Sequence, residues 1–97
     1  MSKIKLKAFD VADYLSSEED MQAYLQVALE DGDPKLLAAA LGDIAKARGM
    51  AQLAADTGLS RESLYKSLSG ERAPSSETLF KVMKSLGFKL SVQTTQG

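Results

Sequence analysis

The sequence lacks both cysteine and histidine, and these two absences exclude several classes of function. Without cysteine the chain can form neither a disulfide framework nor a thiolate metal site. Without histidine it lacks the most common general base and the most common metal ligand. The remaining carboxylates show no paired arrangement, so we expect a protein that is not an enzyme and that binds no metal or other cofactor.

Long apolar runs are missing as well. No run approaches the length of a membrane-spanning helix, and the N-terminus has no apolar signal core. We therefore expect a cytoplasmic location by default and no membrane partner. The chain has 97 residues, 44% of them hydrophobic, which suits one small folded unit with a modest core.

The net charge of −1 is the sum of two oppositely charged parts. Residues 8–33 contain eight acidic residues and no lysine or arginine, whereas residues 34–97 contain nine basic and five acidic residues, a net charge of +4. Such asymmetry indicates separate partners for the two parts. The alternative is that acids near helix N-termini simply favour the helix dipole, which fits residues 18–20 but not Glu30 and Asp31.

Five helix signals follow one another along the chain. Ser16 with Glu19 predicts a capping box at the start of the first amphipathic helix. Asp33 followed by Pro34 predicts a side-chain cap and a proline at the first position of the second helix. The expected helices span roughly 16–32, 33–49, 50–57, 61–68 and 75–87.

The most informative stretch covers residues 52–70 and reads QLAADTGLSRESLYKSLSG. Gly58 suits a tight turn because glycine tolerates a positive φ, and Ser60 can cap the next helix through its hydroxyl. Leu64 and Leu68 lie four residues apart, so they face inward together. The pattern predicts a helix-turn-helix, a motif whose second helix enters the major groove of DNA.

The polar face of that second helix carries the candidate base contacts. DNA binding needs positive groups for phosphates and directional groups for base edges. Arg61 and Lys66 can bond guanine acceptors, whereas Glu62 can accept from a cytosine amine. Ser63 is permissive, and Tyr65 lies at the border of the buried face. The other candidate DNA contacts derived from the residues are Ser60, Ser69 and Arg72.

Neither end of the chain has the pattern of a packed helix. The first seven residues are polar and dotted with lysine, which predicts a mobile start. Near the C-terminus, Phe88, Leu90 and Val92 alternate with polar residues, which predicts a half-buried β-strand. A lone strand needs a partner for its edge, so we expect it to pair with a second copy in a homodimer. The alternative is an extended tail that lies on the helices.

Three groups of residues give the predicted helix-turn-helix a specific resemblance. They are Gln52, Leu53 and Ala54 in the first helix, Gly58, Leu59 and Ser60 at the turn, and Leu64, Leu68 and Gly70 at the close of the second helix. In these positions the chain resembles the lambda-repressor-like (XRE-type) DNA-binding family. The resemblance implies an all-α, five-helix helix-turn-helix domain, with base contacts at the polar positions of the second helix and a phosphate contact at Gln52.

A narrower resemblance covers the run from about residue 9 to residue 90. Its markers are DYL, AYL, GDPKLLAAALGDIAKARGM and GLSRESLYKSLSGERAPS. With these the chain is similar to addiction-module antidote (antitoxin) proteins. This resemblance implies neutralisation of a small basic toxin of the RelE/ParE-like ribonuclease superfamily. The acidic N-terminal segment is the candidate toxin-binding surface, with the candidate residues Tyr14, Leu15, Met21, Tyr24 and Leu25.

Together these patterns predict an all-α antitoxin of a type II toxin–antitoxin module. We expect an acidic helical extension at 1–33, and at 34–97 a helix-turn-helix domain with a short C-terminal β-strand. The homodimer would bind operator DNA and repress its own operon. One alternative is a stand-alone or phage-type transcriptional repressor without a toxin partner. Another is a protein-interaction module with a degenerate DNA site, and the N-terminal helix has the further alternative of completing the core of its own domain.

Overall fold

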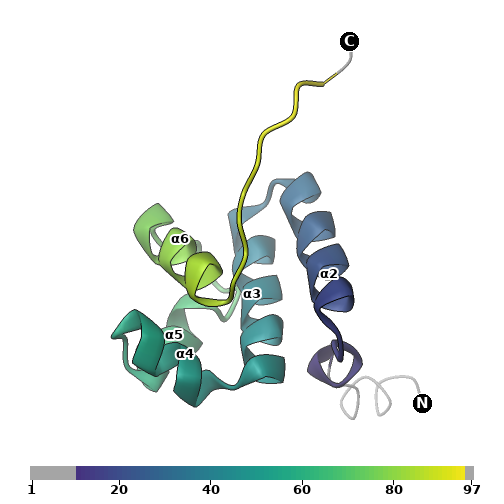
Figure 1. Ribbon diagram of the computed structural model, residues 1–97. Coiled ribbons are helices and arrows are strands. Elements are labelled where there is room, and N and C mark those ends of the chain that lie inside the picture. Colours follow the sequence, from purple (N-terminus) through teal and green to yellow (C-terminus); the bar gives the residue numbers. More distant parts are fainter. Residues whose placement is uncertain (1–10, 96–97) are drawn as a thin grey trace, which may run out of the picture.

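The structure is a computed structural model that describes residues 11–95, and the first seven residues, expected to be mobile, lie outside this range. The described residues form one 3₁₀ helix and five α-helices (Figure 1). The elements are η1 (Val11–Tyr14), α2 (Glu18–Asp31), α3 (Pro34–Arg48), α4 (Met50–Thr57), α5 (Arg61–Ser67) and α6 (Ser76–Ser85). The expected all-α class is confirmed. None of the helices within residues 11–95 is both long enough and apolar enough to span a bilayer.

Local capping interactions set where the first two α-helices begin. The expected capping box at Ser16 and Glu19 is wrong by one residue, because the N-cap of α2 is Ser17, whose Oγ accepts from the backbone N–H of Asp20 at 3.0 Å. Each of the two serines has an acid three residues later, so the pattern alone does not separate them. The cap at Asp33 is confirmed, since its carboxylate accepts from the N–H of Lys35 at 2.9 Å.

Helix α3 forms the centre of the bundle. It packs against η1, α2, α4 and α6, with α2 on one side of it and the remaining α-helices on the other (Figure 1). The largest fully buried side chains come from α3, α5 and α6: Leu41, Ile44, Leu64 and Val82. Around them a single cluster of buried residues reaches from η1 to the end of α6. All the helices therefore share one core.

Helix α2 belongs to this core. Its buried residues Met21 and Leu25 lie in the same cluster as Leu64 of α5 and Val82 of α6. A unit that begins at residue 34 has four α-helices within the described range, and α2 supplies the fifth. The segment before residue 34 thus completes the core, as the alternative interpretation of the N-terminal helix holds. A separate functional role for it stays a prediction.

The expected C-terminal strand is wrong: residues 88–95 are extended but form no β-strand, nor does any other described segment. Gly87 has φ +88 and ends α6 in a Schellman-type turn, in which the N–H of Phe88 donates to the carbonyl of Met83 at 2.9 Å. The Phe88 side chain packs against the core. Phe88 is therefore part of a helix cap, and the residues after it leave the bundle as a tail (Figure 1).

Arg48, the last residue of α3, joins three elements through one guanidinium group. Its Nη1 donates to the carbonyl oxygen of Leu86 at 2.7 Å, where α6 ends, and its Nε donates to the sulfur of Met21 on α2 at 3.2 Å. Its Nη2 lies 3.6 Å from the carboxylate of Glu18, and the guanidinium carbon lies 5.7 Å from the centre of the Phe88 ring. Arg48 thereby ties α2 and the start of the tail to the end of α3.

At Gly42, α3 approaches the end of α5 too closely for a side chain. A Cβ at this position would lie 2.6 Å from the carbonyl oxygen of Leu68 and 3.2 Å from the Cβ of Leu68. The nearest atoms are the backbone oxygen and the Cβ of Leu68, which cannot move aside as the end of a flexible side chain could. Gly42 therefore fixes the distance between α3 and α5.

We predict that Gly42→Ala lowers the free energy of unfolding by about 1–3 kcal/mol, because the added methyl group overpacks this contact. Alanine in a helix interior is otherwise favoured over glycine by about 1 kcal/mol. The control is Ala47→Gly at an exposed position of the same helix, where removing the methyl group should destabilise. Urea unfolding followed by circular dichroism measures both, and a Gly42→Ala protein more stable than the wild type would contradict the prediction.

Candidate nucleic-acid interface

A short turn with a left-handed glycine joins α4 to α5. Gly58 caps α4 in the left-handed region with φ +76, as predicted. Thr57 is buried, and its hydroxyl donates to the carbonyl of Leu53 at 2.8 Å while accepting from the N–H of Leu59 at 3.3 Å. Leu59 packs against the core. The turn is thus held on both sides of the glycine.

Helix α5 then begins with the cap that the sequence predicts. The Oγ of Ser60 accepts from the N–H of Ser63 at 3.0 Å and donates to the Ser63 hydroxyl at 3.0 Å. Leu64 and Leu68 are buried, so the opposite face of α5 points to solvent. That exposed face carries the predicted contact residues Arg61, Glu62, Ser63, Tyr65 and Lys66.

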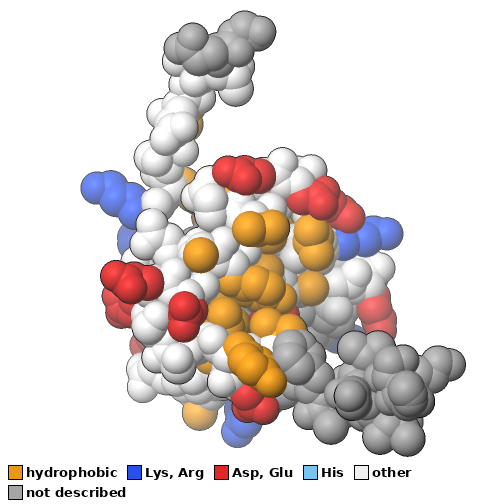
Figure 2. All heavy atoms as spheres, turned by 90° about the vertical axis from the view of Figure 1, so that its right-hand side faces the viewer, with side chains coloured by type: hydrophobic (Ala, Val, Ile, Leu, Met, Phe, Trp, Pro, Cys, Tyr) orange, Lys and Arg blue, Asp and Glu red, His pale blue; other side chains and the backbone are white. Residues whose placement is uncertain are grey.

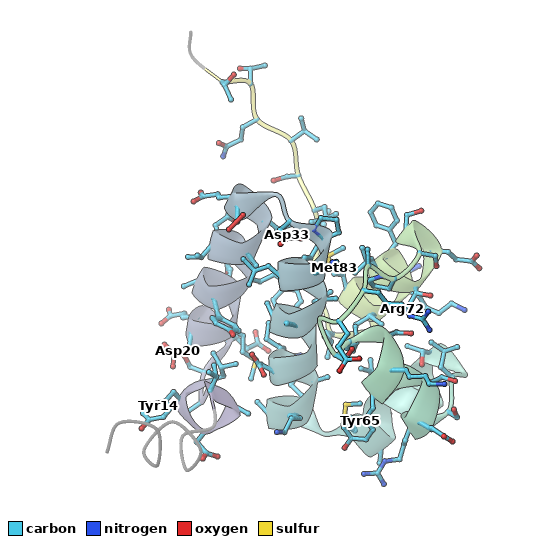
Figure 3. The ribbon with its side chains drawn as sticks, turned by 180° about the vertical axis from the view of Figure 1, so that it is seen from behind. Tyr14, Asp20, Asp33, Tyr65, Arg72 and Met83 are labelled. Carbon is cyan, nitrogen blue, oxygen red and sulfur yellow. The ribbon has the colours of Figure 1, made fainter. Side chains whose placement is uncertain are left out.

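The loop after α5 brings a second positive group to this surface. Lys66 and Arg72 line one hollow together with Glu62, Tyr65, Ser69 and Glu71, and both also line the neighbouring hollow that leads to Ser75. Figure 3 shows Tyr65 and Arg72 on the same side of the molecule, away from α2. The structure therefore gathers most of the predicted DNA-contact residues on one surface, where cations alternate with carboxylates.

Gln52 lies on the first turn of α4. Its side chain is exposed, and its amide nitrogen donates to the carboxylate of Asp56 one turn later at 2.8 Å. A phosphate contact by Gln52 would have to share or replace that hydrogen bond. The predicted role of Gln52 stays a prediction.

The five predicted toxin-binding residues do not lie on one surface. Leu15, Met21 and Leu25 are buried in the core, whereas Tyr14 is exposed. Tyr24 is half-buried, and its hydroxyl donates to the carboxylate of Asp43 on α3 at 2.6 Å. Burial, together with this hydrogen bond and the charge of Asp43, raises the pKa of Tyr24 to about 12. In this structure only two of the five offer a partner any surface.

The three predicted dimerisation residues also differ in their surroundings. Phe88 packs on the core and on Arg48, whereas Leu90 and Val92 are exposed on the tail. Phe88 is thus engaged within the chain, whereas Leu90 and Val92 expose much of their side chains. The homodimer stays a prediction.

Two features near α2 escaped the sequence reasoning. No local pattern in the sequence indicates the contacts of Arg48, because its partner Leu86 is 38 residues away. Val27 was not singled out, although it is 66% exposed in the middle of α2. A signal for Val27 was present, because it follows Tyr24 by three residues and therefore lies on the same side of the helix.

Comparison with known proteins identifies the family to which this arrangement belongs. A family model described as "Probable addiction module antidote protein" matches residues 5–94. The chain belongs to this family of antidote proteins. An antidote acts on a toxin, so the family implies a toxin partner in general. The narrower resemblance seen in the sequence is confirmed, whereas the wider one to the XRE-type family is not shown by these matches.

One relative matches this chain over nearly its whole length. An uncharacterised protein of Haemophilus influenzae is 50% identical over 92 residues, which cover 95% of each chain. No solved structure is significantly similar to this chain.

We predict that Gly58→Val destabilises the turn and weakens DNA binding, because a β-branched residue is strained at φ +76. No atom lies within 4 Å of a Cβ at this position, so the strain is in the backbone alone. The matched control is Gly58→Asn, since asparagine tolerates the left-handed region far better. A Gly58→Val protein with the melting temperature and the DNA affinity of the wild type would contradict this interpretation.

A second prediction concerns the raised pKa of Tyr24. Its neutral hydroxyl is favoured in the folded state, so its contribution to stability is complete below the usual pKa of 10.0 and is lost as pH rises towards about 12. Tyr24→Phe should therefore be less stable than the wild type at pH 8, and the difference should shrink between pH 10 and pH 12. Urea unfolding of both proteins across this range measures it, and a difference that does not change with pH would contradict the assignment.

Proposed function

We propose that this antidote protein binds the operator DNA of its own operon as a homodimer and represses it, and that it neutralises a RelE/ParE-like toxin. The observation that supports DNA binding most directly is the exposed face of α5, which follows a glycine turn held by Thr57 and Leu59. A short helix with a buried leucine side and a polar outer side is what enters a major groove in this motif.

The residues of α5 and of the loop after it have three roles in this proposal. Arg61 and Lys66 are exposed donors at opposite ends of the helix and would bond guanine edges. Arg72 lies beside Lys66 across the shared hollow and would neutralise phosphates of the backbone. Carboxylates within the same surface, such as Glu62, would favour cytosine and disfavour other bases, so that they contribute to specificity rather than to affinity.

The dimer is part of the proposal because one helix-turn-helix covers only a short half-site. Two copies related by a two-fold axis place their second helices about 34 Å apart, one turn of DNA. The exposed tail residues Leu90 and Val92 are available for this contact, whereas Phe88 is engaged within its own chain.

The proposed DNA contacts predict the effect of a paired substitution. Replacing Arg61 and Lys66 together by alanine should weaken binding to DNA from upstream of the operon at least tenfold, because each bidentate base contact contributes about 1–3 kcal/mol. Fluorescence anisotropy at a fixed salt concentration measures the dissociation constant, and circular dichroism verifies that the variant is folded.

The control matched to the Arg61/Lys66 variant is a second double variant, in which Lys81 and Lys84, two exposed lysines of α6, are replaced by alanine. This variant changes the net charge by the same amount but leaves α5 intact, so its affinity should fall far less. Full operator affinity in the folded Arg61/Lys66 variant would show that α5 does not make the contacts that we propose.

A further inference from the structure

One side of α2 carries apolar side chains between two acids. Asp20, Tyr24, Val27 and Asp31 follow one another at intervals of four, three and four residues, so they form a single stripe along the helix. Asp20 and Asp31 are exposed at its two ends, and Val27 is 66% exposed in its centre. Tyr24 packs against the edge of the core, whereas Val27 is not part of the core cluster, so its exposed part is unused within the described chain.

Helix α3 widens this stripe into a face. The hydrogen bond from Tyr24 to Asp43 fixes the register of α2 against α3, which runs back alongside it (Figure 1). Leu36 lies two turns before Asp43, and Asp31 lies two turns after Tyr24, so Leu36 and Asp31 lie at the same end of the pair. Leu36 is 41% exposed. Figure 2 shows hydrophobic side chains gathered on this side of the molecule with acidic side chains around them.

The charge of this region restricts what can cover the face. Helix α2 contains five acidic residues and no basic ones. DNA and anionic lipid surfaces are repelled by such a charge, whereas a cationic protein surface is attracted. An apolar centre with a charged rim is also the usual layout of a protein–protein contact.

We propose that the face formed by Asp20, Tyr24, Val27, Asp31 and Leu36, here called the α2 docking face, binds the toxin through a basic surface with an apolar centre. This inference rests on the proposed function, in which the partner is a toxin, and it adds the place and chemistry of the contact. Val27 is the apolar anchor, and the two aspartates pair with cations of the toxin around it.

The position of the face has a consequence for the complex. Helix α2 lies on one side of α3, whereas α4 and α5 lie on the other (Figure 1). Helix α3 therefore lies between Val27 and the exposed side of α5, and the two surfaces approach each other at Asp43, which bonds Tyr24 and lines one hollow with Tyr65 of α5. Toxin on the α2 docking face leaves the exposed side of α5 accessible, so that one chain holds toxin and DNA together.

The test measures binding to the protein encoded by the short reading frame beside this gene, which is the probe for the toxin. Val27→Lys should raise the dissociation constant at least tenfold, because it places a like charge in the centre of the contact. The control is Phe80→Lys, which alters another largely exposed apolar residue, 58% exposed, on α6. It should leave the dissociation constant within about twofold of the wild type. Circular dichroism and operator binding verify that both variants are folded.

A second pair of variants isolates the charges. Asp20→Asn with Asp31→Asn should slow association at low salt, and the difference from the wild type should fade as salt is added. Asp56→Asn with Glu77→Gln removes the same charge from α4 and α6 and should not slow association.

Three outcomes would overturn the proposal. If the wild type binds the toxin and Val27→Lys binds it equally well, the docking face is wrong while the proposed function stands. If the wild type does not bind that protein at all, both fail. If Val27→Lys instead changes the sedimentation of the chain alone, the face joins two copies of this chain.

Discussion

The guanidinium group of Arg48 is the contact on which the arrangement of the helices depends. A helix leaves its last carbonyls without partners, and in α6 one of these, that of Leu86, receives a charge-assisted hydrogen bond at 2.7 Å from the end of α3. The same group contacts Met21 and the ring of Phe88. The ion pair with Glu18 adds little, because that carboxylate is largely exposed. One side chain thus orients α2, α6 and the tail relative to α3, and the proposed α2 docking face depends on that orientation.

Local signals in the sequence predicted most of the helix boundaries, because caps and turns are decided by residues close together in the chain. Asp33 and Gly58 are examples, since each acts on a neighbour within four residues. The strand was wrong for a related reason. Alternation at Phe88 is as compatible with a helix cap followed by a tail as with a strand, and only the glycine before it separates the two. The contact between Arg48 and Leu86 spans 38 residues and had no local signal.

The exposed face of α5 was predicted correctly from the sequence, whereas the exposed face of α2 was not. The difference follows from the information that hydrophobic periodicity contains. Spacing identified which residues of α5 share a face, and the buried pair Leu64 and Leu68 left the other side exposed. For α2 the same reasoning selected Met21 and Leu25, which the core covers. Periodicity groups residues by face but does not tell which face the rest of the chain covers. Val27 lies beside the covered face of α2. That it is exposed becomes clear only when the packing of α2 against α3 is known.

The close approach at Gly42 means that the residues that position α5 differ from the residues that we propose contact DNA. Leu68 and the glycine opposite it set where α5 lies, while Arg61, Glu62 and Ser63 point to solvent and support no other element. Exposed positions of this kind usually change stability by less than about 0.5 kcal/mol when substituted. In the proposed role, duplicated genes of this family can therefore diverge in the operators that they read while keeping the same scaffold. In that role, a few surface substitutions would be enough to remove cross-talk between sister modules, and none of the intermediates would need to lose its fold.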